Sequence, residues 1–181
     1  MIQMSKLILR KHFLHKRESI SDKEKISLSS KIDKNLLLQK EFMAAINIAS
    51  FTSFRKEPML VKLNEKSYFY PKMNELNLTF HSDKIGFETN RYGIKEPKDK
   101  NNIAISEIDI FLVPLISFNK DLYRIGFGGG YYDRTLTKLL NNKSRPKFYG
   151  ISYDFQLTEF KFESEFDVRL DKVITDKKVY V

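Results

Sequence analysis

Cysteine and tryptophan are both missing from this 181-residue sequence, and only three histidines and seven glycines are present. Without cysteine the chain has no disulfide, no thiolate metal ligand and no cysteine nucleophile, and three histidines argue against a histidine-based zinc site. No run of 18 apolar residues occurs, and basic residues interrupt the first 17 positions, so no membrane span or secretory signal is predicted. We therefore expect a soluble, cytoplasmic protein that binds no membrane.

The apolar content is high enough for a packed core. Hydrophobic residues make up 41% of the sequence, including 15 Phe and 9 Tyr, which excludes a disordered chain. A chain of this length can bury one sizeable core. We expect residues 1–181 to form a single domain and the protein to be a monomer.

Acidic residues are too few to balance the basic ones: 32 Lys and Arg against 23 Asp and Glu give a net charge of +9. Such a charge is typical of nucleic-acid-binding proteins. However, Lys outnumbers Arg by 24 to 8, and Ile, Asn, Phe and Tyr are also abundant. All of these residues have A/T-rich codons, so a genomic bias explains much of the charge. We expect no nucleic-acid partner and keep nucleic-acid binding as the less favoured alternative.

Two helices are predicted at the N-terminus. Ser5 can cap a helix that runs to about Arg17, and Ser21 with Glu24 has the spacing of a capping box for a second helix to about Lys40. The first 40 residues therefore predict a helical hairpin packed on the remaining core. They also hold ten basic and four acidic residues, a net +6.

Strands and helices alternate through the rest of the sequence. Segments with the length and pattern of strands occur at 45–51, 67–70, 76–80, 108–118, 147–152 and 172–175. Proline cannot donate to a ladder, so Pro114 must lie at the end of its strand. Pro58 is suited to open a short helix to Leu63, and a helix is predicted from Tyr131 to Leu140. Residues 81–102 are polar and predict loops or edge structure. This alternation indicates an α/β sandwich.

A glycine-rich segment (residues 119–130, NKDLYRIGFGGG) lies between the buried strand at 108–114 and the helix from Tyr131. Its glycines allow the backbone to approach a ligand, and the helix that follows offers free N–H groups to an anion. Arg124 adds a charged donor, and Asp133 is placed to hold a magnesium ion. In the first predicted helix, Lys6 and Arg10 are one turn apart and can meet at one anion.

The glycine segment has neither the Walker A spacing nor the dinucleotide-binding spacing. On glycine content alone, a flexible turn explains it as well as a phosphate-binding loop does. Asp133 alone is better explained as an acid that stabilises the first turn of a helix. Only the combination of glycines, basic residues and acid favours a nucleotide site.

The segment RIGFGGGYYDRTL (124–136) resembles the signature of the 5-formyltetrahydrofolate cyclo-ligase family. Further resemblances cover nearly the whole chain: KLILR (6–10), YGIKEP (92–97), residues 109–118 and FDVRLD (166–171). The resemblance implies a three-layer α/β/α sandwich with a mostly parallel central sheet, of the NagB/RpiA/CoA-transferase-like type. It also implies conversion of 5-formyltetrahydrofolate to 5,10-methenyltetrahydrofolate with ATP and Mg²⁺, through phosphorylation of the formyl oxygen and release of ADP and phosphate.

The resemblance also assigns roles to residues. It gives catalytic roles to Arg124 and Tyr131, and magnesium binding to Asp133 and Asp167. ATP binding falls on Lys6, Arg10, Arg124, Gly126, Phe127, Gly128, Gly129, Gly130, Tyr131 and Tyr132. Reduced-folate binding falls on Glu57, Phe127, Gly128, Gly130 and Tyr131.

One segment departs from the family pattern. The family has a folate-contacting Glu in a Glu-x-x-Thr segment after the strand at 46–51, whereas this chain reads SFRKEP at 53–58. Aligning the prolines puts Ser53 at the position of that Glu, and Glu57 lies four residues away. An ATP-binding relative with altered or lost folate specificity is therefore the main alternative.

Overall fold

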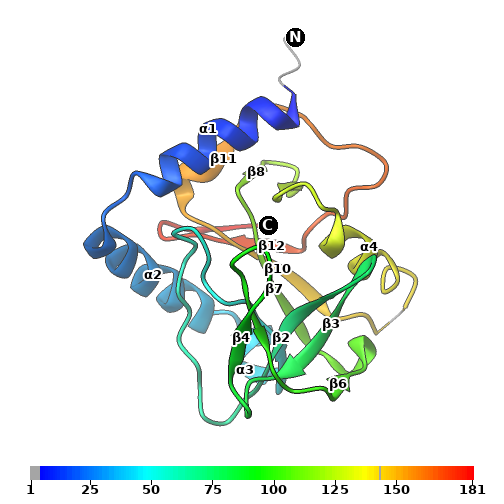
Figure 1. The fold of residues 1–181 in the computed structure, drawn as a ribbon. Coiled ribbons are helices and arrows are strands. Elements are labelled where there is room, and N and C mark those ends of the chain that lie inside the picture. The colour runs from blue at the N-terminus through cyan, green and yellow to red at the C-terminus, as the bar shows by residue number, and fades with distance from the viewer. Residues whose placement is uncertain (1–4, 143) are drawn as a thin grey trace.

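An eight-stranded sheet occupies the centre of the molecule in the computed structural model, which describes residues 5–142 and 144–181 (Figure 1). Its strands lie in the spatial order β13 (Val179–Tyr180), β12 (Lys172–Ile174), β10 (Lys147–Ile151), β7 (Ile110–Pro114), β1 (Asn47–Ala49), β2 (Ser67–Asn74), β3 (Asn77–Ser82) and β6 (Asn102–Ile103). From β12 to β2 all neighbours are parallel, and the outer strands β13, β3 and β6 pair antiparallel.

Smaller elements surround this sheet. A three-stranded sheet has the order β11 (Leu157–Thr158), β8 (Ser117–Asn119), β9 (Arg124–Ile125), and β4 (Phe87–Thr89) pairs with β5 (Lys95–Pro97). The α-helices are α1 (Lys6–Glu18), α2 (Asp22–Leu37), α3 (Lys40–Ala44) and α4 (Tyr131–Thr137). Short 3₁₀ turns lie at Ile105–Glu107 and Asp154–Gln156.

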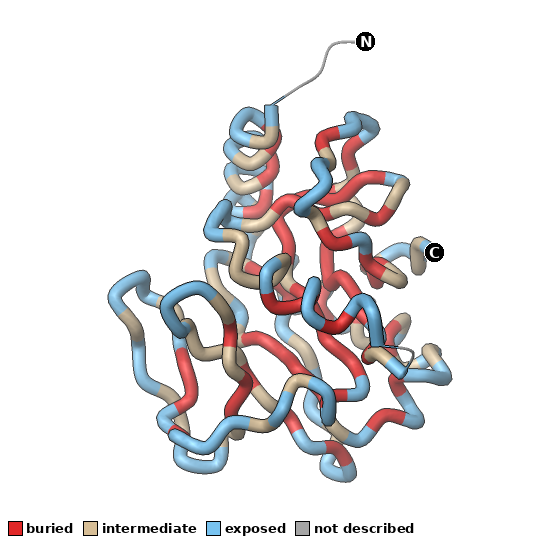
Figure 2. The backbone as a smooth tube through the Cα atoms, turned by 90° about the vertical axis from the view of Figure 1, so that its right-hand side faces the viewer, coloured by how far each residue is buried: buried red, intermediate tan, exposed pale blue. Residues whose placement is uncertain are grey.

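Helices cover both faces of the main sheet. In β7, Ile110 and Leu112 point into the core beneath α2 and α3, whereas Phe111 and Val113 pack in the core shared with α4. This alternation follows from the two-residue period of a strand, and β7 is apolar on both faces because both are covered. Figure 2 shows the buried residues running through these central strands. The predicted three-layer arrangement is confirmed.

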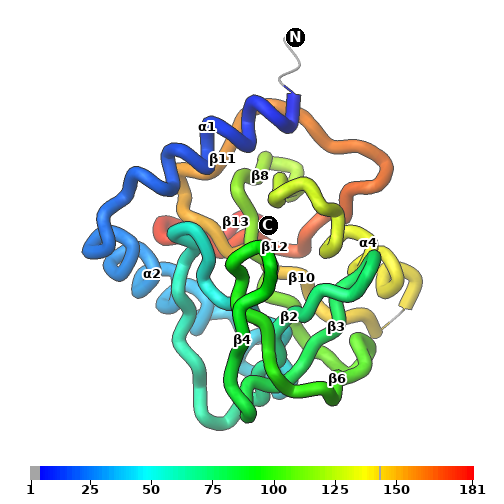
Figure 3. Tube along the Cα trace, viewed as in Figure 1, coloured from blue at the N-terminus to red at the C-terminus, as the bar shows by residue number. Residues whose placement is uncertain are grey.

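The two N-terminal helices begin where the sequence predicts. The Ser5 side chain accepts from the Ile8 N–H, and Ser21 forms a reciprocal capping box with Glu24. Helix α1 packs on the small three-stranded sheet, and Leu9 and Phe13 of this helix are buried between the two. In Figure 3 the helix crosses above β8 and β11. Helix α2 packs on the main sheet instead. None of the helices within the described residues is long and apolar enough to cross a membrane.

The predicted helix from Pro58 to Leu63 is wrong, because this segment forms neither a helix nor a strand. Its N–H groups bond to side chains elsewhere: Met59 donates to the Ser29 hydroxyl and Val61 to the Asp33 carboxylate, both at 3.1 Å, and both partners lie on α2. These bonds replace those that a helix would have formed.

The predicted strand at 108–118 is divided. It ends at Pro114 as expected, but Ser117 to Asn119 forms β8 of the small sheet. The β8–β9 hairpin therefore separates the central strand from the glycine segment. Helix α4 begins at Tyr131 as predicted and ends at Thr137, three residues earlier than expected.

Candidate active site

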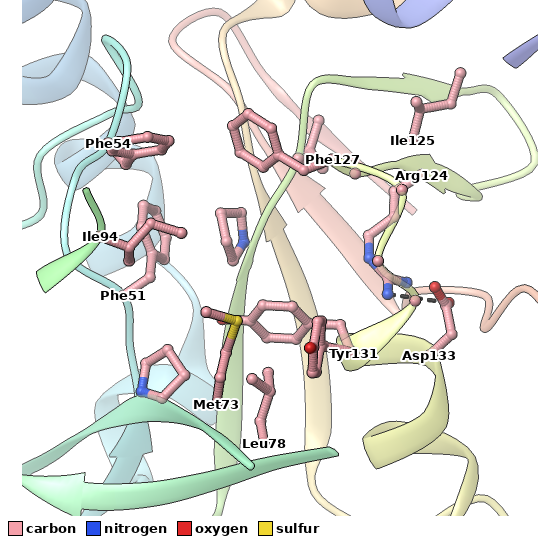
Figure 4. A pocket seen from close by; sticks show the side chains of 18 of the residues that line it. Phe51, Phe54, Met73, Leu78, Ile94, Arg124, Ile125, Phe127, Tyr131 and Asp133 are labelled. Atoms are coloured by element: carbon pink, nitrogen blue, oxygen red, sulfur yellow. Dashed lines mark ion pairs between the residues drawn. The ribbon is translucent and has the colours of Figure 1, made fainter. Parts of the chain in front are cut away.

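A cavity of about 570 Å³ lies beyond the carboxyl ends of the neighbouring strands β1 and β7, the usual ligand position in parallel α/β sheets. Figure 4 shows apolar side chains on one side and the Arg124–Asp133 ion pair on the other. Every residue for which a site role was predicted lines it: Lys6, Arg10, Glu57, Arg124, Gly126, Phe127, Gly128, Gly129, Gly130, Tyr131, Tyr132, Asp133 and Asp167. The structure thus brings together segments from both ends of the chain.

The glycine loop takes a conformation that requires glycine at two positions. Gly128 has φ +103° and Gly130 has φ +67°, a region that residues with a Cβ rarely adopt. Arg10 from α1 holds this loop, since its Nε donates to the Gly126 carbonyl at 2.7 Å. A Cβ on Gly128 would lie 3.4 Å from the Arg10 guanidinium. The loop and α1 therefore form one wall.

Two ion pairs lie side by side on the charged half of the cavity. Lys6 Nζ is 2.5 Å from Asp167 Oδ2, and Arg124 Nη2 is 3.0 Å from Asp133 Oδ1. The neighbouring Val168 N–H donates to Asp133 Oδ1 at 3.0 Å, which links the two acids through one stretch of backbone. Burial opposes ionisation of Asp167, but hydrogen bonds from Lys6 and Ser164 outweigh it and lower the pKa of Asp167. Both acids line the same cavity.

Apolar side chains form the other half of the cavity, and sequence reasoning missed most of them. The missed lining residues are Phe51, Thr52, Phe54, Pro71, Met73, Leu78, Tyr92, Ile94, Glu96, Pro114, Leu115 and Ile125. Phe54 faces Phe127 of the glycine loop, with ring centroids 5.8 Å apart. The signals in the sequence were the family resemblance at 92–97, which includes Tyr92, Ile94 and Glu96, and the position of Phe51 and Phe54 at and just after the end of a predicted strand. Apolar residues there are equally suited to a core, so only the fold assigns them to a cavity.

Glu57 is buried at the base of this cavity, with 3% of its surface exposed. The Phe54 N–H donates to its Oε2 at 3.1 Å, and Arg17 Nη1 lies 3.7 Å from its Oε1. Burial raises the pKa of Glu57 to about 7, and Arg17 partly offsets this effect. Ser53 does not line the cavity; its hydroxyl donates to the Glu57 carbonyl at 2.6 Å. Of the two, Glu57 is therefore the residue placed to contact a ligand.

The charged half is suited to a magnesium–phosphate ligand. Among residues 5–142 and 144–181, no three acidic or histidine side chains form a ready metal cluster. Mg²⁺ does not need one, because it is commonly held by one or two carboxylates together with substrate phosphates and water. Asp133 and Asp167 supply that number of carboxylates beside three basic residues, Lys6, Arg10 and Arg124.

A large cavity with a glycine loop, convergent basic residues, paired acids and an aromatic wall defines an α/β enzyme site for an anionic ligand with a flat apolar part. The sequence comparison identifies the class more closely. The model of the 5-formyltetrahydrofolate cyclo-ligase family matches residues 2–176. The chain belongs to this family.

Individual relatives agree along the whole length. The chain is 38% identical to 5-formyltetrahydrofolate cyclo-ligase of Mycoplasma pneumoniae, covering 96% of this chain and 100% of the relative. It is 28% identical to the Escherichia coli K12 cyclo-ligase, covering 91% and 97%. Among solved structures, a 5,10-methenyltetrahydrofolate synthetase from M. pneumoniae aligns with TM-score 0.75 at 34% identity, covering 96% and 99%. The Aquifex aeolicus synthetase aligns with TM-score 0.81 at 28% identity, covering 97% and 92%.

Proposed function

We propose that this protein converts 5-formyltetrahydrofolate to 5,10-methenyltetrahydrofolate in an ATP-dependent reaction that releases ADP and phosphate. The observation that carries the proposal is the division of one cavity into a charged half, with the glycine loop, and an aromatic half, with Glu57 at its base. Family membership supplies the reaction, and the cavity has a suitable place for each reactant. We also propose that the enzyme is a cytoplasmic monomer.

The folate would occupy the aromatic half. A pterin ring is flat and carries N–H donors at one edge, so it can lie against Phe127 and Phe54 while a carboxylate accepts from that edge. Glu57 is the carboxylate in this position. Tyr131, at the start of α4, would border both reactants, because its ring lies against Gly129 of the loop. This placement directs the formyl group towards the charged half.

ATP would occupy the charged half, with Lys6, Arg10 and Arg124 around its phosphates and the backbone of Gly126 to Gly130 around the transferred group. Phosphoryl transfer depends on positioning and on charge stabilisation, so no protein nucleophile is needed. The formyl oxygen attacks the γ-phosphorus and ADP leaves. The second folate nitrogen then attacks the activated carbon and closes the ring, and loss of phosphate and of the proton on that nitrogen leaves the methenyl group. Tyr132, whose buried hydroxyl has no hydrogen-bond partner among the residues that the structure describes, would face this region.

Magnesium would be held by Asp133 and Asp167. When bound, it would neutralise charge on the phosphates of ATP. In the described structure these acids are paired with Arg124 and Lys6, so the site is close to neutral before ATP arrives. The negative phosphates of ATP would therefore meet the basic residues of the site, and the magnesium ion would meet its two acids.

The activity itself is the first prediction. Purified protein incubated with 5-formyltetrahydrofolate, ATP and Mg²⁺ should generate the methenyl chromophore, followed by absorbance, with ADP formed in equal amount. Omitting ATP should abolish the signal. No absorbance change at high protein concentration would contradict the proposed function. ATP binding without any stabilisation by folate in a thermal shift would favour the alternative of lost folate specificity.

Magnesium dependence gives a second prediction. Asp133→Asn should raise the Mg²⁺ concentration needed for half-maximal activity by at least about tenfold, because a neutral amide is a weaker ligand for a hard cation. A magnesium titration of the initial rate measures this. Asp171→Asn is the matched control, since Asp171 pairs with Arg145 outside the cavity. An unchanged titration curve for Asp133→Asn would remove Asp133 from the metal site.

A further inference from the structure

An arginine that does not line the cavity lies directly behind it. Arg17, in the last turn of α1, is among the largest fully buried side chains, with 0% of its surface exposed. Burying a charged group is costly unless it is paired and hydrogen-bonded. In the sequence, Arg17 is one of several basic residues of the first helix. The proposed reaction assigns no role to Arg17. Its contacts therefore need another explanation.

The guanidinium of Arg17 contacts three separate segments of the cavity wall. Nε donates to the Arg55 carbonyl and Nη1 to the Leu115 carbonyl, both at 3.0 Å. Nη1 also lies 3.7 Å from Glu57 Oε1, and the group lies over the Phe127 ring with its carbon 5.8 Å from the ring centroid. One planar group thus joins the loop after β1, the end of β7 and the glycine loop. A lysine cannot reproduce these contacts, because its donors share a single nitrogen.

We propose that Arg17 is a positioning residue for the folate: its guanidinium fixes the Glu57 carboxylate and Phe127 in place for the pterin ring. This inference rests on the proposed function. The backbone it holds is unusual, since Arg55 and Lys56 have φ +46° and +60°. Such a conformation is unfavourable for residues with a Cβ and persists only where surrounding contacts impose it. The bond from Arg17 to the Arg55 carbonyl is one of those contacts.

Charges around Glu57 agree with this role. The groups that face it are Arg17 of α1, Lys25 of α2, the Tyr132 phenol of α4 and the Tyr153 phenol beyond β10. Arg17 is the nearer and more buried of the two cations, and it is the only one of the two with a direct Glu57 contact in the described residues. Loss of Arg17 would leave Glu57 buried beside two phenols and one more distant lysine. The carboxyl group would then hold its proton to a higher pH.

Steady-state kinetics of Arg17→Met test the proposal. We expect the folate KM to rise about tenfold or more, because a small displacement of a binding group is costly, while the ATP KM stays within about twofold. Adding Arg17→Met to Glu57→Gln should raise the folate KM far less than Arg17→Met does alone, because both changes act on one contact. A purely structural role would lower stability and the active fraction and would leave both KM values unchanged.

The pH dependence of the folate KM is a second test, and a change in protein stability alone would not shift its midpoint. Folate binding needs the ionised carboxylate, so 1/KM for folate should rise with pH through a midpoint near the pKa of Glu57, about 7. In Arg17→Met the midpoint should move to higher pH, because removal of the cation makes ionisation harder. Glu57→Gln should lose this step. An Arg17→Met profile that superimposes on the wild type would overturn the inference.

Controls separate the possible failures. Arg145→Met removes a different arginine, partly buried, that pairs with an acid, Asp171, away from the cavity, and it should leave both KM values unchanged. If Arg17→Met does not fold, Arg17→Lys carries the same test, and a wild-type folate KM in that variant would overturn the inference. Absence of methenyl formation by the wild type would overturn the proposed function as well, whereas wild-type turnover with an unaffected folate KM in the Arg17 variants would overturn this inference alone.

Discussion

Arg124→Met is expected to lower kcat about 10²- to 10³-fold, the usual cost of removing one donor aimed at charge that develops in a transition state. Arg124 is buried, and its second nitrogen donates to the Val168 carbonyl at 3.2 Å, so the side chain is fixed beside Asp133 before ATP binds. A preorganised cation stabilises a transferring phosphoryl group without any cost of rearrangement during the reaction. Single-turnover rates of methenyl formation at saturating ATP and folate would measure the effect.

Two comparisons make this expectation specific. Arg124→Lys keeps the charge but not the two-pronged contact with Asp133 and Val168, so its rate should lie between wild type and Arg124→Met. Arg169→Met is the control outside the cavity, because Arg169 is exposed and donates to the Asp121 carbonyl. A folded Arg124→Met variant with a wild-type single-turnover rate would exclude Arg124 from phosphoryl transfer.

Gly128→Ala is expected to raise the ATP KM about tenfold and to cost about 1–3 kcal/mol of stability, the range for a residue held in an unfavourable backbone conformation. Gly128 has φ +103°, which strains any residue with a Cβ, and an added Cβ would come into van der Waals contact with the Arg10 guanidinium at 3.4 Å. Relaxation of the loop would move the backbone away from the phosphates and weaken the Arg10 bond to the Gly126 carbonyl. Initial rates against ATP concentration and urea unfolding measure the two effects.

Gly126→Ala is a matched control within the same loop. Gly126 does not have a positive φ, and a Cβ there would meet nothing within 4 Å. We expect its unfolding free energy to stay close to that of the wild type, because the substitution imposes no unfavourable backbone conformation. If both alanine variants lose stability equally, loop flexibility would explain the loss better than the Gly128 conformation does.

Local signals in the sequence predicted the starts of α1, α2 and α4 and the end of β7 correctly. Ser5 and Ser21 begin their helices through bonds to N–H groups three residues away, so the interaction is contained in a short stretch of sequence. Pro114 ends β7 for an equally local reason, the missing N–H. The helix predicted from Pro58 failed because its N–H groups bond to Ser29 and Asp33 on α2, about 30 residues earlier. No local pattern contains that information.

The candidate site also has a part that the sequence predicts and a part that it does not predict. The glycine loop and its neighbours Arg124 and Asp133 form one continuous segment, so the sequence by itself indicated an anion site there and, by resemblance, the family. Only the tertiary structure paired Lys6 with Asp167, 161 positions apart. It also turned Arg17 inward, behind Glu57, while Lys11 and Lys16 of the same helix stayed exposed. The physical reason is that packing against distant strands decides which charges are buried, and helix periodicity records only which residues share a face.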